Sequence, residues 1–364
     1  MRISHIALST ANLYGLKNER LVSDTRSIDG FAAIDGLSTE RGATLGHPSG
    51  TSLYGRPRYL ETMKGVLPIL AAPFTESGQI HYPSVRTQIA ALADRGCHGA
   101  ILFGFGTEFY KLTDEERGEF VRVAVEAGGE HGIPIYASIT DQSTVAAVDW
   151  AERFADAGVD GLMVLPPHTG SPSEDALLEH LRRVGTATAL PVMVQYAPQA
   201  VGGSIGPETF ARLSEEVPTI TDYKIESQPP GPYISALLEA TDGEVNVLVG
   251  SAGQKFIEAL DRGAVGVVPS GGMCELYVHI YERYVAGDRE AAVEAHNALL
   301  PVLNQLVGSE SFVHFDKWIQ AERGFIADEA AHVREPTSHP DEHVVSLFRE
   351  QYERIESRLD DGDR

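Results

Sequence analysis

The stretch ADAGVDGLMVLP (155–166) predicts the repeating unit of the fold: a helix end, a glycine that caps it, and a short apolar strand. Two further stretches share this design, ADRGCHGAILFG (93–104) and LDRGAVGVVP (260–269). A short, uninterrupted apolar run between turn signals is typical of a strand that is buried on both faces. The repeat therefore predicts parallel strands that are joined by helices.

Such apolar runs recur after residue 63 and alternate with longer amphipathic stretches. The predicted strands are 66–73, 99–104, 134–139, 161–166, 191–197, 219–225, 245–250 and 264–269. Helices are predicted to follow, for example at 113–127, where Thr113 and Glu116 form a capping-box pattern. This arrangement predicts a (β/α)8 TIM barrel rather than an open doubly wound sheet. No GxGxxG follows the first strand, which counts against a dinucleotide-binding fold.

The chain divides into three parts. Residues 1–62 carry no sustained helical or strand period, so we expect a disordered extension or a start codon assigned too far upstream. Residues 63–286 are predicted to form the barrel. Residues 287–364 are predicted to form a C-terminal helical region packed on it. Helical patterns at 271–286, 289–306, 310–323 and 342–357 exceed what a barrel needs, and they predict additional C-terminal helices and an oligomer surface.

Composition narrows the classes of protein that the chain can represent. Hydrophobic residues make up 43% of it, which excludes global disorder. There is neither an apolar run of about 18 residues nor a secretory signal, so we expect no membrane partner. Cys97 and Cys274 form no CxxC pattern and are too few for a disulfide framework. These features predict a soluble cytoplasmic protein.

The chain is strongly acidic. The net charge is −23, with 52 acidic residues against 29 basic ones. Because nucleic-acid binding depends on Lys and Arg meeting phosphates, this balance counts against nucleic acid as a partner. The acidity is dispersed and lysine is scarce, which favours a halophilic protein over an ordinary acidic one, since salt screens the self-repulsion.

The scarce lysines help to locate the chemistry. They stand at positions 17, 64, 111, 224, 255 and 317. Catalytic residues of a TIM barrel lie at the C-terminal ends of strands. Lys224 alone lies in an apolar strand end, TDYKIES (221–227), whereas Lys255 and Lys317 fall in helical patterns typical of solvated side chains. Burial disfavours the cation and frees the amine as a nucleophile. The alternative is a structural ion pair between Lys224 and Glu226.

Two neighbouring segments supply further candidates. Tyr196 ends the strand in PVMVQYAP (191–198), so we expect its phenol to face the same mouth and to transfer protons, the alternative being an ordinary strand aromatic. The loop GFGTEFYKLTDEER (104–117) has glycines that permit close backbone approach, and Thr107 with nearby amides is a candidate carboxylate site. Glu108 is interpreted mainly as a residue that ties this loop together by hydrogen bonds, the alternative being a catalytic carboxylate.

From Met63 to the C-terminus the chain resembles the dihydrodipicolinate synthase and N-acetylneuraminate lyase superfamily of Schiff-base enzymes. The stretches that carry the resemblance are VLPILAAPFTESGQIHY (66–82), the Gly-Glu loop with LTDEER, LPPH (165–168), the Tyr of strand five and the Lys of strand six. The resemblance implies a barrel fold, a Schiff-base lysine at Lys224 and a proton-relay tyrosine at Tyr196. The small-residue turn after strand eight implies a substrate contact at Ser270.

The sequence departs from this family at the predicted site. The family usually has GTTGE in the strand-two loop, whose threonines hold the pyruvate carboxylate, and Phe105 and Gly106 stand there instead. His168 in PPHT stands where a relay tyrosine is usual. Gln199 and Ala200 replace the usual arginine for a dicarboxylic substrate. These departures count against lysine biosynthesis.

The phrases PVMVQ-AP, YKIES and AERGFI resemble a narrower branch that includes 2-keto-3-deoxy-L-arabonate dehydratase. The resemblance predicts a Schiff-base lyase for 2-keto-3-deoxy sugar acids, most simply a dehydratase. Alternatives are an aldolase for such acids or for pyruvate, a 4-hydroxy-tetrahydrodipicolinate synthase, and a degenerate ligand-binding barrel. No cofactor is expected because the imine is itself the electron sink, and without an HExxH cluster no metal is expected. The expected partners are a small 2-keto acid and further copies of the chain, as a dimer or tetramer.

Overall fold

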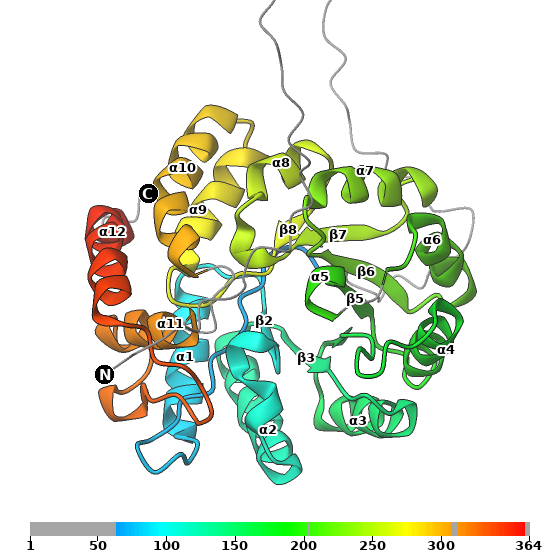
Figure 1. Ribbon diagram of the computed structural model, residues 1–364, viewed down its shortest axis with the longest axis horizontal. Helices are drawn as coiled ribbons and strands as arrows, with labels where there is room; N and C mark the ends of the chain where they lie inside the picture. The colour runs from blue at the N-terminus through cyan, green and yellow to red at the C-terminus, as the bar shows by residue number, and fades with distance from the viewer. Residues whose placement is uncertain (1–62, 202–203, 307–311, 361–364) are drawn as a thin grey trace, which may run out of the picture. The chain divides into compact units, whose positions relative to one another are not determined.

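The fold is built from parallel strands and the helices that connect them, in a computed structural model that describes residues 63–201, 204–306 and 312–360 (Figure 1). The strands are β1 (Gly65–Val66), β2 (Ala100–Leu102), β3 (Ile135–Ile139), β4 (Gly161–Val164), β5 (Val192–Tyr196), β6 (Ile220–Ile225), β7 (Asn246–Val249) and β8 (Gly266–Val267). The helices are α1 (Tyr82–Asp94), α2 (Asp114–His131), α3 (Thr144–Ala157), α4 (Glu174–Gly185), α5 (Pro198–Val201), α6 (Pro207–Glu216), α7 (Pro230–Ala240), α8 (Phe256–Asp261), α9 (Cys274–Val285), α10 (Arg289–Leu306), α11 (Phe312–Glu322) and α12 (Glu342–Asp360). Our expectation for residues 1–62 lies outside the described part of the chain.

The strands close into a barrel. All pairs are parallel and the order is β1-β8-β7-β6-β5-β4-β3-β2. Beyond the ends of this order, Ile69 pairs with both Ile101 and Ser270, and the Ile101 amide donates to the Pro68 carbonyl at 2.9 Å. These bridges join β1 to β2, so no sheet edge is left open. The predicted (β/α)8 TIM barrel is confirmed.

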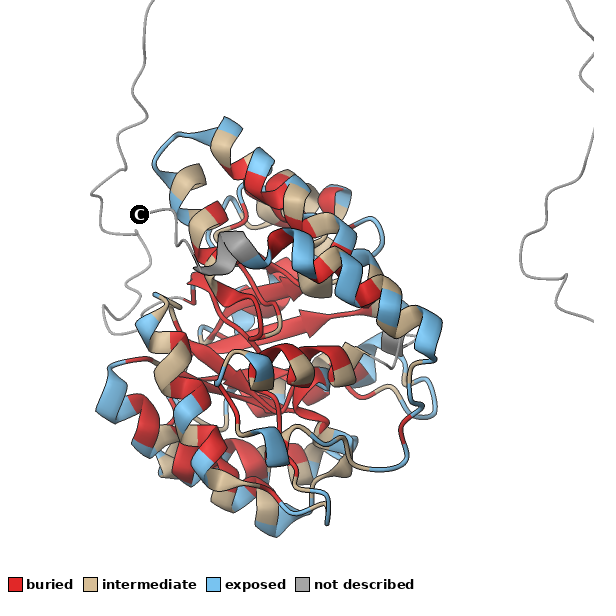
Figure 2. Ribbon diagram, turned by 90° about the vertical axis from the view of Figure 1, so that its left-hand side faces the viewer, coloured by how far each residue is buried: buried red, intermediate tan, exposed pale blue. Residues whose placement is uncertain are grey.

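Side chains of each strand alternate between the barrel interior and the helices outside. The interior cluster consists of Met63, Leu67, Ile69, Ile101, Tyr136, Met163, Met193, Leu248 and Val268. A second and larger cluster lies between the strands and the surrounding helices. Figure 2 shows the result, with buried strands at the centre and exposed residues on the outer helix faces. Which of the two sides a strand residue occupies therefore decides whether it can reach a substrate in the mouth.

Local sequence signals set the helix ends. Thr113 accepts from the Glu116 amide and the Glu116 carboxylate accepts from the Thr113 amide, so the predicted capping box opens α2. The glycines of the three repeated stretches, Gly96, Gly158 and Gly263, have φ of 76°, 88° and 100°. Glycine adopts this left-handed conformation without steric cost, which lets the chain leave the helix and enter the next strand.

The C-terminal helices follow the barrel, as the sequence predicted. α10 packs against α9, and α12 packs against α10 (Figure 1). Phe348 and Tyr352 of α12 are buried, and Phe348 stacks on Phe315 of α11 with 4.1 Å between ring centroids. Within the described ranges, none of the helices has the length and apolar character that a membrane crossing requires.

Candidate active site

Lys224 lies on the interior side of β6 near its C-terminal end. In the strand register it pairs with Gln195 of β5 and Leu248 of β7, and Leu248 belongs to the interior cluster. The residue is only 5% exposed. A C-terminal strand end is where TIM barrels carry their reactive groups. The predicted position of Lys224 is confirmed, and its role as a nucleophile stays a prediction.

Glu226 accompanies Lys224 at the same strand end. Its Oε1 lies 3.5 Å from the Lys224 Nζ and accepts from the Ser251 amide at 2.9 Å. Its Oε2 accepts from the Gln195 side-chain nitrogen at 2.5 Å. A Cβ on Gly250 would lie 2.3 Å from the Glu226 Cγ, so only glycine leaves room for this carboxylate. The site thus presents an amine next to a carboxylate that two further groups hold in place.

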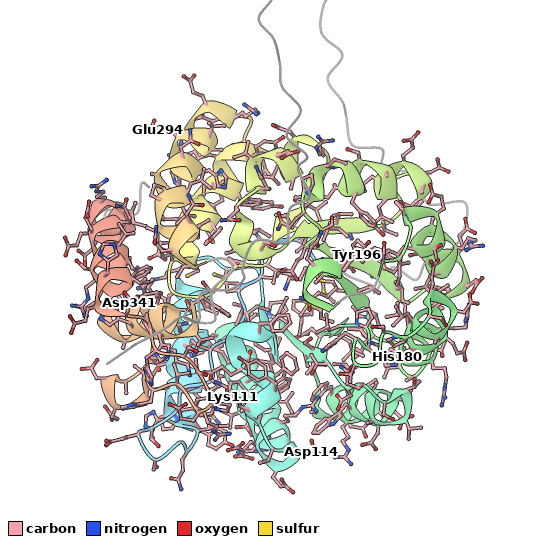
Figure 3. The ribbon with its side chains drawn as sticks, in the orientation of Figure 1. Lys111, Asp114, His180, Tyr196, Glu294 and Asp341 are labelled. Carbon is pink, nitrogen blue, oxygen red and sulfur yellow. The ribbon has the colours of Figure 1, made fainter. Side chains whose placement is uncertain are left out.

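Tyr196 lies elsewhere, and our expectation that it faces the mouth is wrong. Its ring belongs to the cluster outside the barrel, stacked on Tyr233 at 4.3 Å and edge-on to Phe210 at 5.5 Å. Figure 3 labels Tyr196 near the end of β5. Its hydroxyl lies 3.5 Å from the Ser204 Oγ. Because successive strand residues point to opposite faces, a shift of one position exchanges interior for exterior. Gln195 occupies the interior position instead.

The alternation itself could have identified Gln195 from the sequence. Val192, Val194 and Tyr196 share one face of β5 and pack against the helices, whereas Met193 points into the interior cluster. Counting by two from Met193 leads to Gln195. Aromatic character made Tyr196 the more conspicuous residue, although position in the pleat is the stronger criterion.

The strand-two loop holds three predicted substrate contacts, and they have different environments. Phe105 is 37% exposed. Gly106 is buried, and a Cβ there would lie 3.3 Å from the Ile69 side chain. The Thr107 hydroxyl is fully buried and donates to the Leu70 carbonyl at 2.6 Å. Since that proton is already donated, the Thr107 side chain holds the segment after β1 to the loop and is not a free donor for a carboxylate.

Glu108 joins the same loop to the C-terminal part of the chain. Its Oε1 accepts from the Lys317 Nζ at 2.5 Å and its Oε2 from the Lys111 Nζ at 2.8 Å. All three side chains are nearly inaccessible, and Lys317 also donates to the His332 carbonyl at 2.8 Å. These bonds agree with our structural interpretation of Glu108. The expectation of a solvated Lys317 is wrong because α11 turns this residue inward onto the barrel.

Burial changes the protonation equilibrium of Lys317. Loss of hydration lowers its pKa to about 8, although the Glu108 carboxylate opposes the change by favouring the cation. The ammonium also lies 4.4 Å from the centre of the Phe74 ring. The Lys317 ammonium thus contacts a carboxylate, a backbone carbonyl and an aromatic ring. Lys224 differs, because its ion-pair partner lies at 3.5 Å.

His168 and Ser270 lie in loops after β4 and β8. The His168 Nδ1 lies 3.3 Å from the Gln142 side-chain nitrogen, and the Gln142 side-chain oxygen Oε1 accepts from the His168 backbone amide at 2.9 Å. Ser270 hydrogen-bonds Asp316, whose pKa is raised by full burial. Gln142, which organises the loop after β4 from the loop after β3, carried no signal in the sequence.

Two buried hydroxyls were missed by sequence reasoning. Among the described residues, the Ser138 and Ser227 Oγ atoms are buried without a hydrogen-bond partner. Ser138 pairs in register with Met163, so it points into the barrel. Ser227 directly follows Glu226 in the chain. Because an unpaired buried hydroxyl is costly, both are candidates for contact with a bound molecule.

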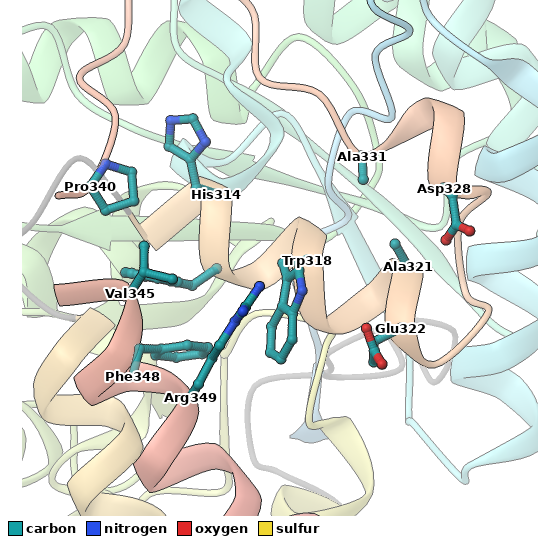
Figure 4. A pocket seen from close by; sticks show the side chains of 11 residues that line it. His314, Trp318, Ala321, Glu322, Asp328, Ala331, Pro340, Val345, Phe348 and Arg349 are labelled. Atoms are coloured by element: carbon teal, nitrogen blue, oxygen red, sulfur yellow. The ribbon is translucent and has the colours of Figure 1, made fainter. Parts of the chain in front are cut away.

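A groove of about 520 Å³ lies away from these residues, between α11, α12 and the segment that connects them (Figure 4). Its lining includes His314, Trp318, Pro340, Phe348 and Arg349. None of the residues that line it belongs to a strand. The groove is therefore separate from the strand end that carries Lys224.

The chain is a closed barrel whose sixth strand carries a buried lysine beside a carboxylate. This combination of fold and site is that of a barrel enzyme with an amine at a strand end. The chain matches the model of the dihydrodipicolinate synthetase family over residues 62–351, and it belongs to that family. It is an enzyme of the lyase type, as the members of this family are.

Relatives within the family carry different names. A 4-hydroxy-tetrahydrodipicolinate synthase of Methanopyrus kandleri is 28% identical over 66% of this chain and 80% of its own. An L-2-keto-3-deoxyarabonate dehydratase of Azospirillum brasilense is 26% identical over 76% of this chain and 90% of its own. The fold is similar to that of the 4-hydroxy-tetrahydrodipicolinate synthase from Methylacidiphilum fumariolicum, with a TM-score of 0.76 at 24% identity, covering 83% of this chain and 99% of that one.

Proposed function

We propose that the chain is a Schiff-base lyase for 2-keto-3-deoxy sugar acids and that it acts as a dehydratase. The observation that carries the proposal is the pair of Lys224 and Glu226 at the interior end of β6, with 3.5 Å between the Nζ and the Oε1. Relatives of both names, synthase and dehydratase, cover most of the chain, which supports the lyase chemistry that the two share.

In the proposed reaction the Lys224 amine attacks the C2 ketone of the substrate. Loss of water from the adduct leaves a protonated imine, which acidifies the hydrogens on C3. The Glu226 carboxylate removes one of them to give an enamine, and the electron pair then expels the C4 hydroxyl, which leaves as water after protonation. Tautomerisation and hydrolysis release the product and restore the amine.

Glu226 takes over the proton transfers that the sequence assigned to Tyr196. The carboxylate lies beside the lysine, whereas the Tyr196 ring packs between the barrel and its helices. Gln195 and the Ser251 amide hold the carboxylate from two directions. A base fixed before the substrate arrives needs no reorganisation during the reaction. Phe105, Gly106, His168 and Ser270 stay in the proposal as contacts of the substrate.

Dehydration is preferred over aldol cleavage because of the strand-two loop. An aldolase or synthase must hold free pyruvate, and Phe105 and Gly106 offer no hydroxyl for its carboxylate. The Thr107 hydroxyl is already bonded to Leu70. A dehydratase leaves the carbon chain of its substrate intact, so the enzyme can bind the substrate along the whole length of that chain. Aldol cleavage is the second candidate, supported by the relatives named as synthases.

A turnover screen with 2-keto-3-deoxy acids tests the proposal. With 2-keto-3-deoxypentonates we expect a semialdehyde of 2-oxoglutarate and little pyruvate. Efficient release of pyruvate, or condensation of pyruvate with an aldehyde, would overturn the dehydratase and leave the Schiff-base lyase. Absence of any borohydride-trapped adduct with these acids would overturn the Schiff base as well.

The setting of the enzyme forms part of the proposal. We expect a homo-oligomer, a dimer or tetramer, in the cytoplasm. The net charge of −23 supports function at high salt, where screening weakens the self-repulsion of the surface. Sedimentation and thermal unfolding across a salt series test these expectations.

A further inference from the structure

The chain has two cysteines, and the fold brings them together. Cys97 lies between α1 and β2, and Cys274 is the first residue of α9. The Cys97 thiol lies close enough to influence the Cys274 thiol, and the Cys274 Sγ donates to the Glu275 Oε2 at 3.6 Å. Cys274 is fully buried, whereas Cys97 is half-buried at the edge of the same hydrophobic cluster. Neither is close in sequence to the other, so only the tertiary structure creates this pair.

Contacts on both sides of Cys97 hold it against α9. Cys274, Val278 and Tyr281 are spaced by four and three residues, so they lie on one face of the helix. A Cβ on Gly96 would lie 3.5 Å from Val278, and the His98 ring meets the Tyr281 ring edge-on at 5.1 Å. The residues before and after Cys97 therefore run along the face that begins with Cys274.

We propose that Cys97 and Cys274 form a reversible intramolecular disulfide, a redox modification site that fastens the start of β2 to α9. The co-oxidant is a peroxide or a small disulfide such as oxidised glutathione. With hydrogen peroxide, the Cys97 sulfur attacks one oxygen, the O–O bond breaks and water leaves, which gives a sulfenic acid. The Cys274 sulfur attacks that sulfur and expels a second water. Two thiols and one peroxide yield one disulfide and two waters.

The two thiols have different parts in this step. Cys97 is the one that an oxidant reaches, because it is partly exposed. Burial raises the pKa of the Cys274 thiol, which makes it the less reactive of the two thiols toward an oxidant. The Cys274 proton then leaves with the departing hydroxide. Cys97 acts as the attacking thiol and Cys274 as the resolving one.

The bond would restrain the turn that leads into α9. Immediately before Cys274, the Gly272 amide donates to Asp316 at 3.0 Å, and the Gly272 carbonyl accepts from Arg323 at 2.8 Å. This turn begins at Ser270, one of the proposed substrate contacts. A crosslink between segments distant in sequence also restricts the unfolded chain, so the oxidised protein should melt at a higher temperature than the reduced one.

The test uses the full-length reduced protein, treated with oxidised glutathione or with stoichiometric hydrogen peroxide. Mass mapping should find a Cys97–Cys274 linked peptide within the monomer, and dithiothreitol should reverse it and lower the melting temperature again. With peroxide, Cys274→Ala should over-oxidise Cys97, since the resolving thiol is gone. With glutathione, the same variant should retain an adduct on Cys97, whereas Cys97→Ser should leave Cys274 reduced.

Three outcomes would overturn the proposal. One is a stable glutathione adduct on Cys97 of the unsubstituted protein with Cys274 still reduced. Another is a disulfide between chains in place of the internal one. The third is the absence of any oxidation at either cysteine. The readout is a mass and a melting temperature, so it does not depend on which substrate the enzyme uses.

Discussion

Lys317 and Lys224 are both buried beside a glutamate, and their surroundings differ. Lys317 lies 2.5 Å from Glu108, donates to a backbone carbonyl and faces the Phe74 ring. Lys224 lies 3.5 Å from Glu226, at a strand end of the barrel. The tighter pair, whose members are both inaccessible, ties the strand-two loop to α11. The looser pair places its amine at a strand end, where TIM barrels carry their reactive groups.

The comparison shows why a shifted pKa alone does not identify the reactive lysine. Lys317 has the pKa lowered to about 8, a property that is often associated with catalytic lysines. It lies in a C-terminal helix rather than at a strand end, and chain atoms enclose its ammonium. Position in the barrel is the reason that we propose Lys224 rather than Lys317 for the chemistry, since structural ion pairs also perturb pKa values.

The largest expected effect is that of Lys224→Ala. This change removes the amine that forms the imine, so turnover should fall below detection while the fold is retained. Borohydride with a keto-acid substrate should leave a covalent mass on Lys224 of the unsubstituted enzyme. Mass mapping that places the adduct on Lys317 or Lys111 would show that the reactive lysine is not Lys224.

Glu226→Gln should reduce kcat by roughly 10²–10⁴-fold, the usual range for loss of general acid–base catalysis. The amide keeps the size of the side chain and an acceptor for the Ser251 amide, so the melting temperature should change little. Trapping with borohydride should still mark Lys224. A variant with unchanged kcat would show that another group transfers the protons.

Glu108→Gln should act on stability. It leaves the Lys317 and Lys111 charges buried without their carboxylate, and breaking a buried pair in this way costs about 3–5 kcal/mol. Denaturant unfolding measures the loss. The matched control is Glu119→Gln, which removes an exposed partner of Arg122 at 2.5 Å and should cost less than about 1 kcal/mol. An equal loss of unfolding free energy in the two variants would show that the Glu108 ion pairs do not stabilise the fold.

The protonation of Lys317 should make stability depend on pH. Its pKa is about 8 in the folded chain, below the unfolded value of about 10.4, so the unfolded state binds more protons between these two values. Its contribution to the free energy of unfolding should therefore rise with pH across this window, by up to about 3 kcal/mol. The difference between the unsubstituted protein and Lys317→Met, measured from pH 7 to pH 10, isolates this contribution. A difference that stays constant with pH would contradict it.

The smallest expected effect is that of Tyr196→Phe. Within the described part of the chain, its hydroxyl has a 3.5 Å contact with Ser204, and the ring packing survives the change. We expect kcat and KM to stay within about threefold of the unsubstituted enzyme, which corresponds to less than about 1 kcal/mol. Steady-state kinetics measure this directly. A severe loss of kcat would return the proton relay to Tyr196.

Much of the architecture was predictable because its signals are local. Each predicted strand overlaps an observed one, since apolar runs between glycine caps depend on neighbouring residues only. The capping box at Thr113 and Glu116 is local in the same sense. The position of Lys224 was predictable because TIM barrels carry their reactive groups at the C-terminal ends of strands, and Lys224 is near the end of a predicted strand.

By itself, the sequence determined the strands, the helix caps, the barrel and the strand end that carries Lys224. The tertiary structure decided which face of β5 points inward, and it selected Gln195 over Tyr196. It also buried Lys317 against Glu108 and brought Cys97 close to Cys274. The physical reason is that strand and cap signals arise within a few residues, whereas burial and pairing depend on segments that meet only when the barrel closes.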